Sequence, residues 1–400
     1  MTNKQPKLSE FAKVVSYIGI IGYGGPAIIA QMKKALVHKH QWVAEEDFMN
    51  TLSLAQILPG ATGVALLGYL GYRMKGILGW IVGSFLYVFP AFLFTTVLSV
   101  LYFQYHSLSL VQKLFAGLGA LVVGLLINAI LQLSKPVFGK ADRKDYKGFL
   151  IALTGFSLAV FTHINVVFII LLSGFLGFLF YFFTHEFEGF HLQHTNALPA
   201  ATKGTIVSRD VLYLLIALAA GAVLLFLSHS IYWLLSATFF QIGSIAFGGG
   251  FTTIPLIQHI VVDGLHWVSL LEFRDGIAIG QITPGPVFIT AAFIGYKVAG
   301  WLGALVSTVS VFLPSLLLIL ILGKFHEQIK HLKIVRVIIK GFLAGFIGII
   351  ASVALSFGEK SLINWQTWLI FLATLLVVVK LKKDVIWAIL GTILVSLIIL

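Results

Sequence analysis

The chain has 400 residues, of which 59% are hydrophobic and 10% charged, and its mean hydropathy is +1.00. This composition excludes an ordinary soluble globular protein and indicates a polytopic membrane protein. The net charge of +12 arises from basic residues in short loops between apolar segments, which favours topology signals over a nucleic-acid interface, and the absence of cysteine excludes disulfides and thiolate-held cofactors.

The predicted elements are transmembrane helices. The N-terminus carries lysines but no small-residue cleavage site after a short apolar core, so we expect no removable signal peptide. Five apolar runs are long enough to cross a hydrocarbon core, which takes roughly 20 helical residues. They are residues 76–102, 117–133, 211–227, 301–322 and 337–355. Helices are expected because these runs lack the alternation of a barrel strand.

Two interruptions break the apolar sequence of the first half. Each consists of helix-breaking residues, and they are Gly24, Gly25 and Pro26, then Pro59 and Gly60. Gln56 precedes the second interruption and Thr62 follows it. The apolar segments beside them are too short to cross alone, which predicts half-helix pairs, either re-entrant hairpins or thin full crossings.

A polar stretch at residues 184–208 and the apolar run 211–227 separate two halves. We predict an N-terminal repeat at 1–183, a polar linker with an inverting transmembrane helix at 184–229, and a C-terminal repeat at 230–400. The linker residues His185, Glu186, Glu188, His191 and His194 resemble a metal cluster in composition. They lack a fixed ligand spacing, so a hydrated loop is preferred and we expect no metal or other cofactor.

The second half repeats both interruptions. Gln56 and Gln281 are 225 residues apart, as are Pro59 and Pro284. The second-half interruptions are Gly248, Gly249 and Gly250, then Pro284, Gly285 and Pro286. This internal similarity indicates two homologous halves.

Basic residues predict that the halves are inverted. Lys and Arg number five between residues 30 and 76 but two in the matching 254–300, and in the three later loops the excess of basic residues alternates between the second and the first half. Under the positive-inside rule the halves then have opposite orientations, as in many secondary transporters. We expect a multi-pass protein of the inner, cytoplasmic membrane with a cytoplasmic N-terminus.

The interruptions favour anion binding. Helices that restart near Ala27, Ala61, Phe251 and Val287 would present free N–H groups and a partial positive charge. Hydroxyl donors lie beside them at Thr62, Thr252, Thr253, Thr283 and Thr290. Neutral donors suit a tetrahedral dianion that must be released as well as bound. A single Pro-Gly is commonly only a kink, but finding both breaks twice favours a substrate-lining role.

Charged residues near the breaks have two interpretations each. Arg73 and Lys297 occupy equivalent positions and serve either as entrance guides or as interfacial snorkelling cations. The carboxylates Glu46, Asp47, Glu272 and Asp275, with Glu45, are either solvated helix starts or carriers of a coupling proton.

The double motif resembles the chromate ion transporter family in its long, two-domain form. The first half has Gly24-Gly25-Pro26 with Gln56 and Pro59-Gly60, and the second has Gly248-Gly249-Gly250 with Gln281 and Pro284-Gly285-Pro286. The likeness covers nearly the whole chain, although Ala61 stands where the family has a second proline and Tyr23 where phenylalanine is usual. The resemblance implies an antiporter that exports chromate with the proton gradient, and sulfate is the natural look-alike.

Three alternatives stay open from the residues. A sulfate or other anion carrier and a passive anion channel would both use broken helices. A membrane assembly or sensor partner would not transport at all. No hydrolase, metalloprotease or phosphate-loop motif supports an enzyme, and no feature demands the homodimer that the apolar surface would allow.

Overall fold

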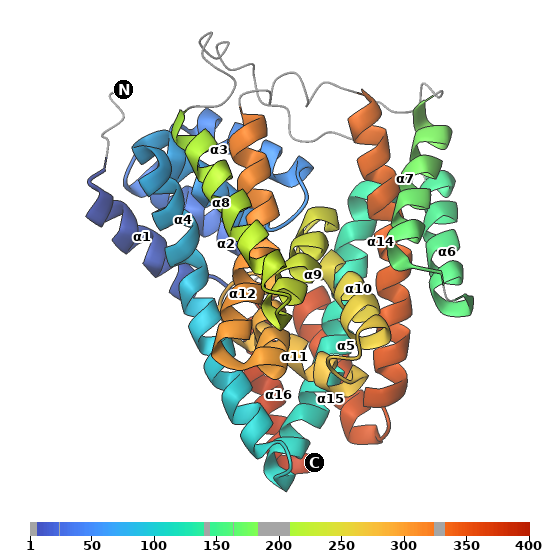
Figure 1. Cartoon of the computed structure of the whole chain (residues 1–400). Coiled ribbons are helices and arrows are strands. Elements are labelled where there is room, and N and C mark those ends of the chain that lie inside the picture. Colours follow the sequence, from blue (N-terminus) through green and yellow to red (C-terminus); the bar gives the residue numbers. More distant parts are fainter. Residues whose placement is uncertain (1–5, 24, 140–144, 163, 183–208, 324–332) are drawn as a thin grey trace. The chain divides into compact units, whose positions relative to one another are not determined.

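A computed structural model describes residues 6–23, 25–139, 145–162, 164–182, 209–323 and 333–400 of the chain. The regular structure of these residues is all helical (Figure 1). Gly24 and the linker residues that resemble a metal cluster only in composition lie outside the described residues.

The elements of the first repeat run from α1 to α7. They are α1 (Leu8–Ile21), α2 (Gly25–Lys33), the π-helix η1 (Lys34–Lys39), α3 (Glu45–Ile57), α4 (Thr62–Tyr105), α5 (Ser109–Phe138), α6 (Tyr146–Phe161) and α7 (Val166–Phe182). The helix α8 (Arg209–Leu227) follows.

The second repeat follows the order of the first, with two short 3-10 helices, η3 and η5, and the π-helix η7 added. Its elements are α9 (Ile231–Ile245), η3 (Gly250–Thr252), α10 (Thr253–Ile257), the π-helix η4 (Gln258–Gly264), α11 (Leu270–Ile282), η5 (Val287–Ile289), α12 (Thr290–Leu322), α14 (Lys333–Ser361), α15 (Trp365–Leu375), η7 (Leu376–Lys380) and α16 (Val385–Ile399).

Shared irregularities show that the repeats have one backbone plan. The equivalent π-helices η1 and η4 are each followed by a left-handed residue, Gln41 with φ 53° and His266 with φ 52°. The long helices α4 and α12 leave the helical region at equivalent points, where Gly76 has φ 63° and Gly300 has φ 62°. A positive φ favours glycine, so these two bends are encoded locally.

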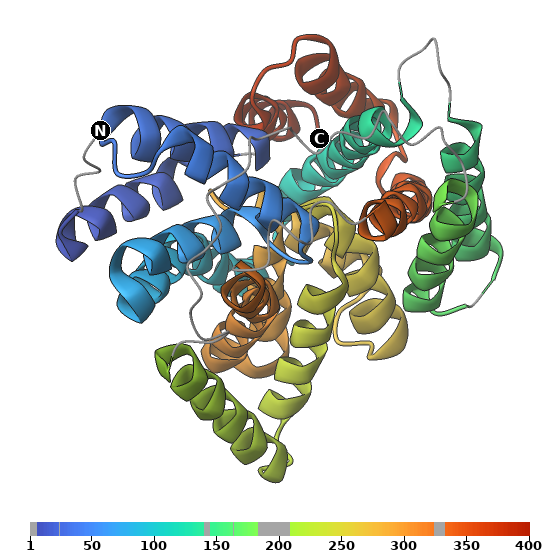
Figure 2. The same cartoon turned by 90° about the horizontal axis from the view of Figure 1, so that it is seen from above.

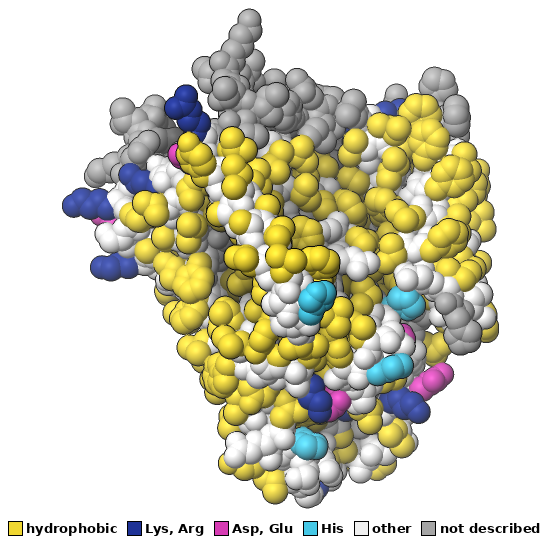
Figure 3. Space-filling view, viewed as in Figure 1, with side chains coloured by type: hydrophobic (Ala, Val, Ile, Leu, Met, Phe, Trp, Pro, Cys, Tyr) yellow, Lys and Arg dark blue, Asp and Glu magenta, His cyan; other side chains and the backbone are white. Residues whose placement is uncertain are grey.

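Five helices are long and apolar enough to cross a membrane, and they contain the five predicted spans. They are α4, α5, α8, η5 with α12, and α14. Apolar side chains cover most of the face shown in Figure 3. α8 is the most exposed of the five, with 6% of its apolar window buried, which is the exposure of a lipid-facing helix. The chain is therefore a multi-pass membrane protein.

The fold divides into two compact units, each of which draws on both repeats. Unit 1 is Met1–Thr96, Leu192–Gly249 and Thr283–His331, and unit 2 is Val97–His191, Gly250–Ile282 and Leu332–Leu400. In unit 1, α12 packs along α9. In unit 2, α14 packs against α6 and α7, which lie beside it in both views (Figures 1 and 2). Small residues allow this approach, because a Cβ on Gly341 would lie 2.4 Å from the Ser173 carbonyl oxygen.

Candidate functional site

The proline breaks of the two repeats have the same local form. After α3 the chain passes through Pro59 and Gly60 before α4 begins, and after α11 it passes through Pro284 and Gly285 before η5 begins. Gly60 has φ 102° and Gly285 has φ 135°, which side-chain-bearing residues rarely adopt. The glycines therefore set the break in each repeat.

Within unit 1, each proline break is hydrogen-bonded to the helix end that precedes the glycine break of the other repeat. The Gly60 N–H donates to the Ala246 carbonyl oxygen at 2.7 Å, and the Gly285 N–H donates to the Gly22 carbonyl oxygen at 2.9 Å. Gly22 and Ala246 are the equivalent C-caps of α1 and α9. The two repeats thus interlock through a reciprocal pair of main-chain hydrogen bonds.

Close packing reinforces this reciprocal arrangement. A Cβ on Gly60 would lie 2.5 Å from Ser315 Cβ, and a Cβ on Gly285 would lie 2.6 Å from Ala91 Cβ. Ala91 and Ser315 are equivalent residues, directly after the prolines inside α4 and α12. Both glycines are required by space as well as by backbone conformation.

The helices that restart after the breaks begin close to the predicted residues. α2 begins at Gly25 and includes Pro26, α4 begins at Thr62, η3 begins at Gly250 and η5 begins at Val287, with Pro286 as its N-cap. The first N–H groups of a helix have no intrahelical acceptor, so such starts can receive an anion. Gly248 has φ 87° and Gly249 has φ 112°, so the glycine break of the second repeat is also irregular.

The predicted hydroxyl donors differ in their surroundings. Thr62 is half-buried, whereas Thr252, Thr253, Thr283 and Thr290 are buried. Thr283 Oγ1 lies 3.0 Å from Thr95 Oγ1 within unit 1. Thr290 and Thr253 donate to the carbonyl oxygens of Val287 and Gly250 in their own helix starts. Their hydroxyl protons therefore stabilise the restarted helices.

The two equivalent glutamines are also different. Gln56 is exposed at the end of α3. Gln281 is half-buried at the end of α11, and its buried Nε2 has no hydrogen-bond partner among the described residues. A buried amide donor without a partner costs free energy, so Gln281 has capacity for an acceptor that is not part of the chain.

The predicted acidic residues Glu46, Asp47 and Glu272 lie in the first turns of α3 and α11. Glu46 is exposed, as is Lys297 inside α12, and Arg73 Nη1 of α4 forms an ion pair with Asp47 Oδ1 at 3.0 Å in unit 1. Glu272 accepts from the Ser269 N–H at 2.8 Å, while Ser269 Oγ accepts from the Glu272 N–H, which forms a capping box. These contacts fit the interpretation of solvated, capped helix starts.

Asp275 is the exception, because it is buried in an ion pair with Arg274. The exposed fractions of Arg274 and Asp275 are 8% and 5%. Arg274 Nε and Nη2 donate to Asp275 Oδ1 at 2.9 and 2.7 Å, and Tyr102 Oη donates to Asp275 Oδ2 at 2.9 Å. Arg274 Nη1 donates to Ser361 Oγ at 3.1 Å.

Arg274 and Tyr102 are functional candidates that sequence reasoning missed. Arg274 stands between two acidic residues and therefore resembles part of a solvated helix start. The signal that could have found it is position: Arg274, Ala278 and Gln281 recur at helical spacing and so share one face of α11. Because Gln281 is a predicted site residue, its neighbours on the same helix face, Ala278 and Arg274, could have been added to the candidates.

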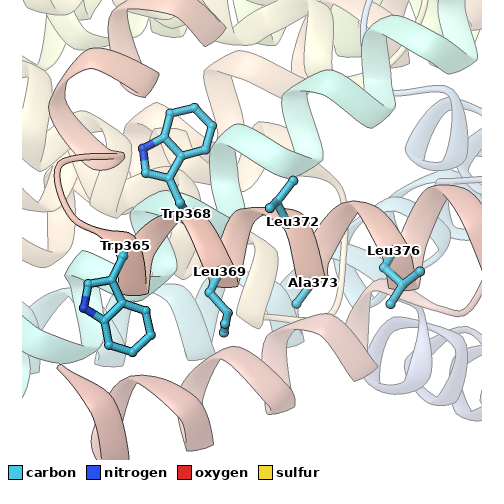
Figure 4. A pocket seen from close by; sticks show the side chains of 6 residues that line it. All are labelled: Trp365, Trp368, Leu369, Leu372, Ala373 and Leu376. Atoms are coloured by element: carbon cyan, nitrogen blue, oxygen red, sulfur yellow. The ribbon is translucent and has the colours of Figure 1, made fainter.

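A groove beside α15 does not suit an anion. It has a volume of about 700 Å³ and follows one side of α15 and the start of η7 (Figure 4). Its lining is apolar and consists of Trp365, Trp368, Leu369, Leu372, Ala373 and Leu376. Apolar side chains offer an oxyanion no charge and few donors, so this groove is not a candidate anion site.

Comparison with known proteins places the chain among transporters. It is 32% identical to an uncharacterized transporter of Methanocaldococcus jannaschii over 91% of this chain and 87% of that protein. It is 29% identical to a chromate transport protein of Cupriavidus metallidurans over 92% of this chain and 86% of that protein. A chromate transport protein of Pseudomonas aeruginosa is 28% identical over 87% of this chain and 80% of its own length.

No solved structure matches the chain. The sequence profile of one family, described as chromate transporter, matches residues 9–178 and again residues 233–397. The two matches correspond to the two repeats, and together they cover most of the chain. This family is a family of transporters and not of enzymes. The chain accordingly belongs to the chromate transporter family, in the long form that carries the family domain twice.

Proposed function

We propose that this chain is a secondary transporter that exports a tetrahedral oxyanion, chromate, across the cytoplasmic membrane in a proton-coupled cycle. Relatives about 30% identical along most of their length are named for chromate transport. The N-terminus is cytoplasmic and the repeats are inverted in this proposal, because matching loops have opposite basic content.

The reciprocal hydrogen bonds of Gly60 and Gly285 are the observation that carries the proposal. They join the two repeats reciprocally, so that each repeat supports the irregular backbone of the other. Many transporters place substrate where broken helices of two repeats meet, and exposed main-chain donors there bind anions. The proposed anion contacts are the residues of the breaks, the neighbouring glutamines, and Thr62, Thr252 and Thr283. The Thr290 hydroxyl instead donates within its own helix start.

The proposal is tested with purified protein in proteoliposomes. Chromate flux is measured with and without an imposed pH gradient, and with excess sulfate as competitor. We expect gradient-dependent chromate flux that sulfate inhibits, and stimulation of labelled flux by unlabelled substrate on the opposite side. Flux without this trans-stimulation would indicate a channel, sulfate-only flux would change the substrate, and inert proteoliposomes would contradict transport.

A matched pair of variants tests the role of the breaks. Gly285→Leu is expected to reduce flux to background, because the added side chain meets Ala91 and the backbone has φ 135°. Gly221→Leu on α8 is the control, since no atom lies within 4 Å of a Cβ there. Equal flux in Gly285→Leu and Gly221→Leu at equal protein levels would show that the proline break has no role in transport.

A further inference from the structure

Unit 2 contains a buried polar cluster with an ion pair at its centre. Among the described residues, this is the only ion pair in which both members are less than 10% exposed. Arg274 and Asp275 form the pair, Tyr102 and Ser361 complete its hydrogen bonds, and Gly119 lies against the guanidinium. A Cβ on Gly119 would lie 2.8 Å from Arg274 Cζ, so α5 leaves space for the guanidinium there. Buried ionisable residues in membrane proteins are costly and commonly serve transport.

The guanidinium has the geometry that an oxyanion needs. Arg274 directs Nε and Nη2 to a single carboxylate oxygen, Asp275 Oδ1. A guanidinium presents five N–H donors in a planar fork, which fits chromate, sulfate or phosphate as well as a carboxylate. Asp275 therefore occupies the donors that an oxyanion would use.

A second donor lies on the same face of α11. Arg274, Ala278 and Gln281 are four and three residues apart, and Ala278 is small and fully buried. Gln281 lies about 10 Å along the helix axis from Arg274 at 1.5 Å per residue. Its buried Nε2 has no partner among the described residues, as noted above. The face thus offers a neutral donor near the proline break and a charged donor two turns away.

We propose that the transported oxyanion displaces Asp275 from Arg274 and binds there together with a proton on Asp275. This inference rests on the proposed function and specifies its coupling. A displaced, ionised carboxylate would be left buried without its cation, so it takes a proton from solution. Tyr102 can serve both states, because its hydroxyl donates to the carboxylate and its oxygen accepts from the carboxylic acid.

The ionisable groups around Asp275 come from α11 and α4. The charges that act on it are Arg274 and Glu272 on α11, and the Tyr102 hydroxyl on α4 donates a hydrogen bond to it. α5 and α14 present Gly119 and Ser361 to the cluster, and neither titrates. η4 also packs against α11 and carries His259 and Asp263, whose charges act on each other.

The proposal fixes the direction of coupling. A dianion and a proton that bind together move together, so the pair carries a net charge of −1. An inside-negative membrane potential drives that charge outward, which is compatible with export. Exchange of an anion for a proton, as the family resemblance implies, would instead require that the two bind in alternation.

The experiment measures protons taken up when sulfate or chromate is added to the purified full-length protein in weak buffer with a pH indicator. The wild type is expected to take up as much as one proton per bound anion, and its affinity should rise up to about tenfold per unit of falling pH. Asp275→Asn should bind the anion without proton uptake and with a flat pH profile. Arg274→Gln should lose at least about tenfold in affinity.

Asp145→Asn is the matched control. Asp145 pairs with Lys340 and accepts from Tyr181 Oη at 2.7 Å, so it combines a carboxylate, a phenol and a cation as the Arg274 cluster does, with an ammonium in place of the guanidinium. Burial raises the pKa of Asp145, but the hydrogen bonds from Lys340, Tyr181 and the Gly148 N–H lower it by more than burial raises it. The pKa therefore lies below its usual value, and Asp145 stays ionised near neutral pH. Its replacement should leave proton uptake unchanged.

Each outcome bears on a separate claim. Proton release by the wild type, or unchanged uptake in Asp275→Asn, would overturn the inference while oxyanion transport stands. If Asp275→Asn does not fold, two measurements still test the inference. One is whether the wild type takes up or releases protons when the anion binds, and the other is the weakened pH dependence of anion affinity that we expect in Tyr102→Phe. A wild type that neither binds nor carries any oxyanion would refute the proposed function itself.

Discussion

The helices α3 and α11 occupy equivalent places in the two repeats, yet they carry different chemistry. Both have 13 residues, both end one residue after a glutamine, and both lead into a proline break. At two equivalent positions α3 has Met49 and Asn50 where α11 has Arg274 and Asp275. The backbone plan is thus kept while the charged pair is confined to one repeat.

This difference separates scaffold from chemistry. The acidic residues of α3 pair near the surface, where Lys33 Nζ meets Glu45 Oε1 at 2.6 Å and Arg73 meets Asp47. The pair on α11 is buried, and Tyr102 and Ser361 are hydrogen-bonded to it. Reciprocal main-chain contacts require two similar repeats, whereas a single proton-linked site requires only one charged helix.

The largest effect is expected when the buried pair is broken on one side. Asp275→Ala leaves the Arg274 guanidinium buried without its carboxylate, which typically costs about 3 to 5 kcal/mol of folding free energy. Thermal unfolding in detergent measures this loss, with Asp145→Ala as the partly exposed comparison. A stability close to wild type would show that Arg274 finds another partner or reaches water.

Transplanting the α3 residues into α11 separates stability from function. The double variant Arg274→Met with Asp275→Asn reproduces Met49-Asn50, and removing both charges together should change stability by less than either single loss. We expect folded protein whose oxyanion transport has lost its pH dependence and most of its rate. Full pH-dependent flux in this variant would show that the buried pair is structural.

The helical, repeated and multi-pass character of the chain was predictable because it depends on apolar run length and on recurring glycine and proline. The five spans and the two breaks follow from these local signals. The bends at Gly76 and Gly300 and the docking of Gly60 on Ala246 were not predicted. Glycine shows where a backbone can turn, but not which distant carbonyl will receive its N–H.

The candidate site was predictable only in part for the same reason. The sequence places Gln56 and Gln281 at one repeat position, but exposure distinguishes them and depends on tertiary packing. Asp275 and Glu272 are both acidic residues near a helix start, yet one is buried and the other completes a capping box. Arg274 became a candidate only when its burial was known.

A smaller effect should distinguish the two glutamines. Gln281→Leu removes a buried donor that lacks a partner, so stability should rise by about 1 kcal/mol while oxyanion flux falls roughly tenfold. Gln56→Leu at an exposed position should change stability by no more than about 0.5 kcal/mol. Thermal unfolding and flux are measured on the same preparations, and a fall in both for Gln281→Leu would contradict a binding role.

The smallest effect is expected at the surface pair of the first repeat. Arg73 and Asp47 have side chains 41% and 20% exposed, and such ion pairs contribute about 0 to 1 kcal/mol, less at high salt. Asp47→Asn and Arg73→Gln should therefore alter stability little and leave the pH dependence of transport intact. An entrance role for Arg73 would appear as a raised KM at low ionic strength, because a guiding charge acts on anion capture before binding. Loss of the pH response in Asp47→Asn would instead move the proton-linked site to α3 and reverse the assignment of the two repeats.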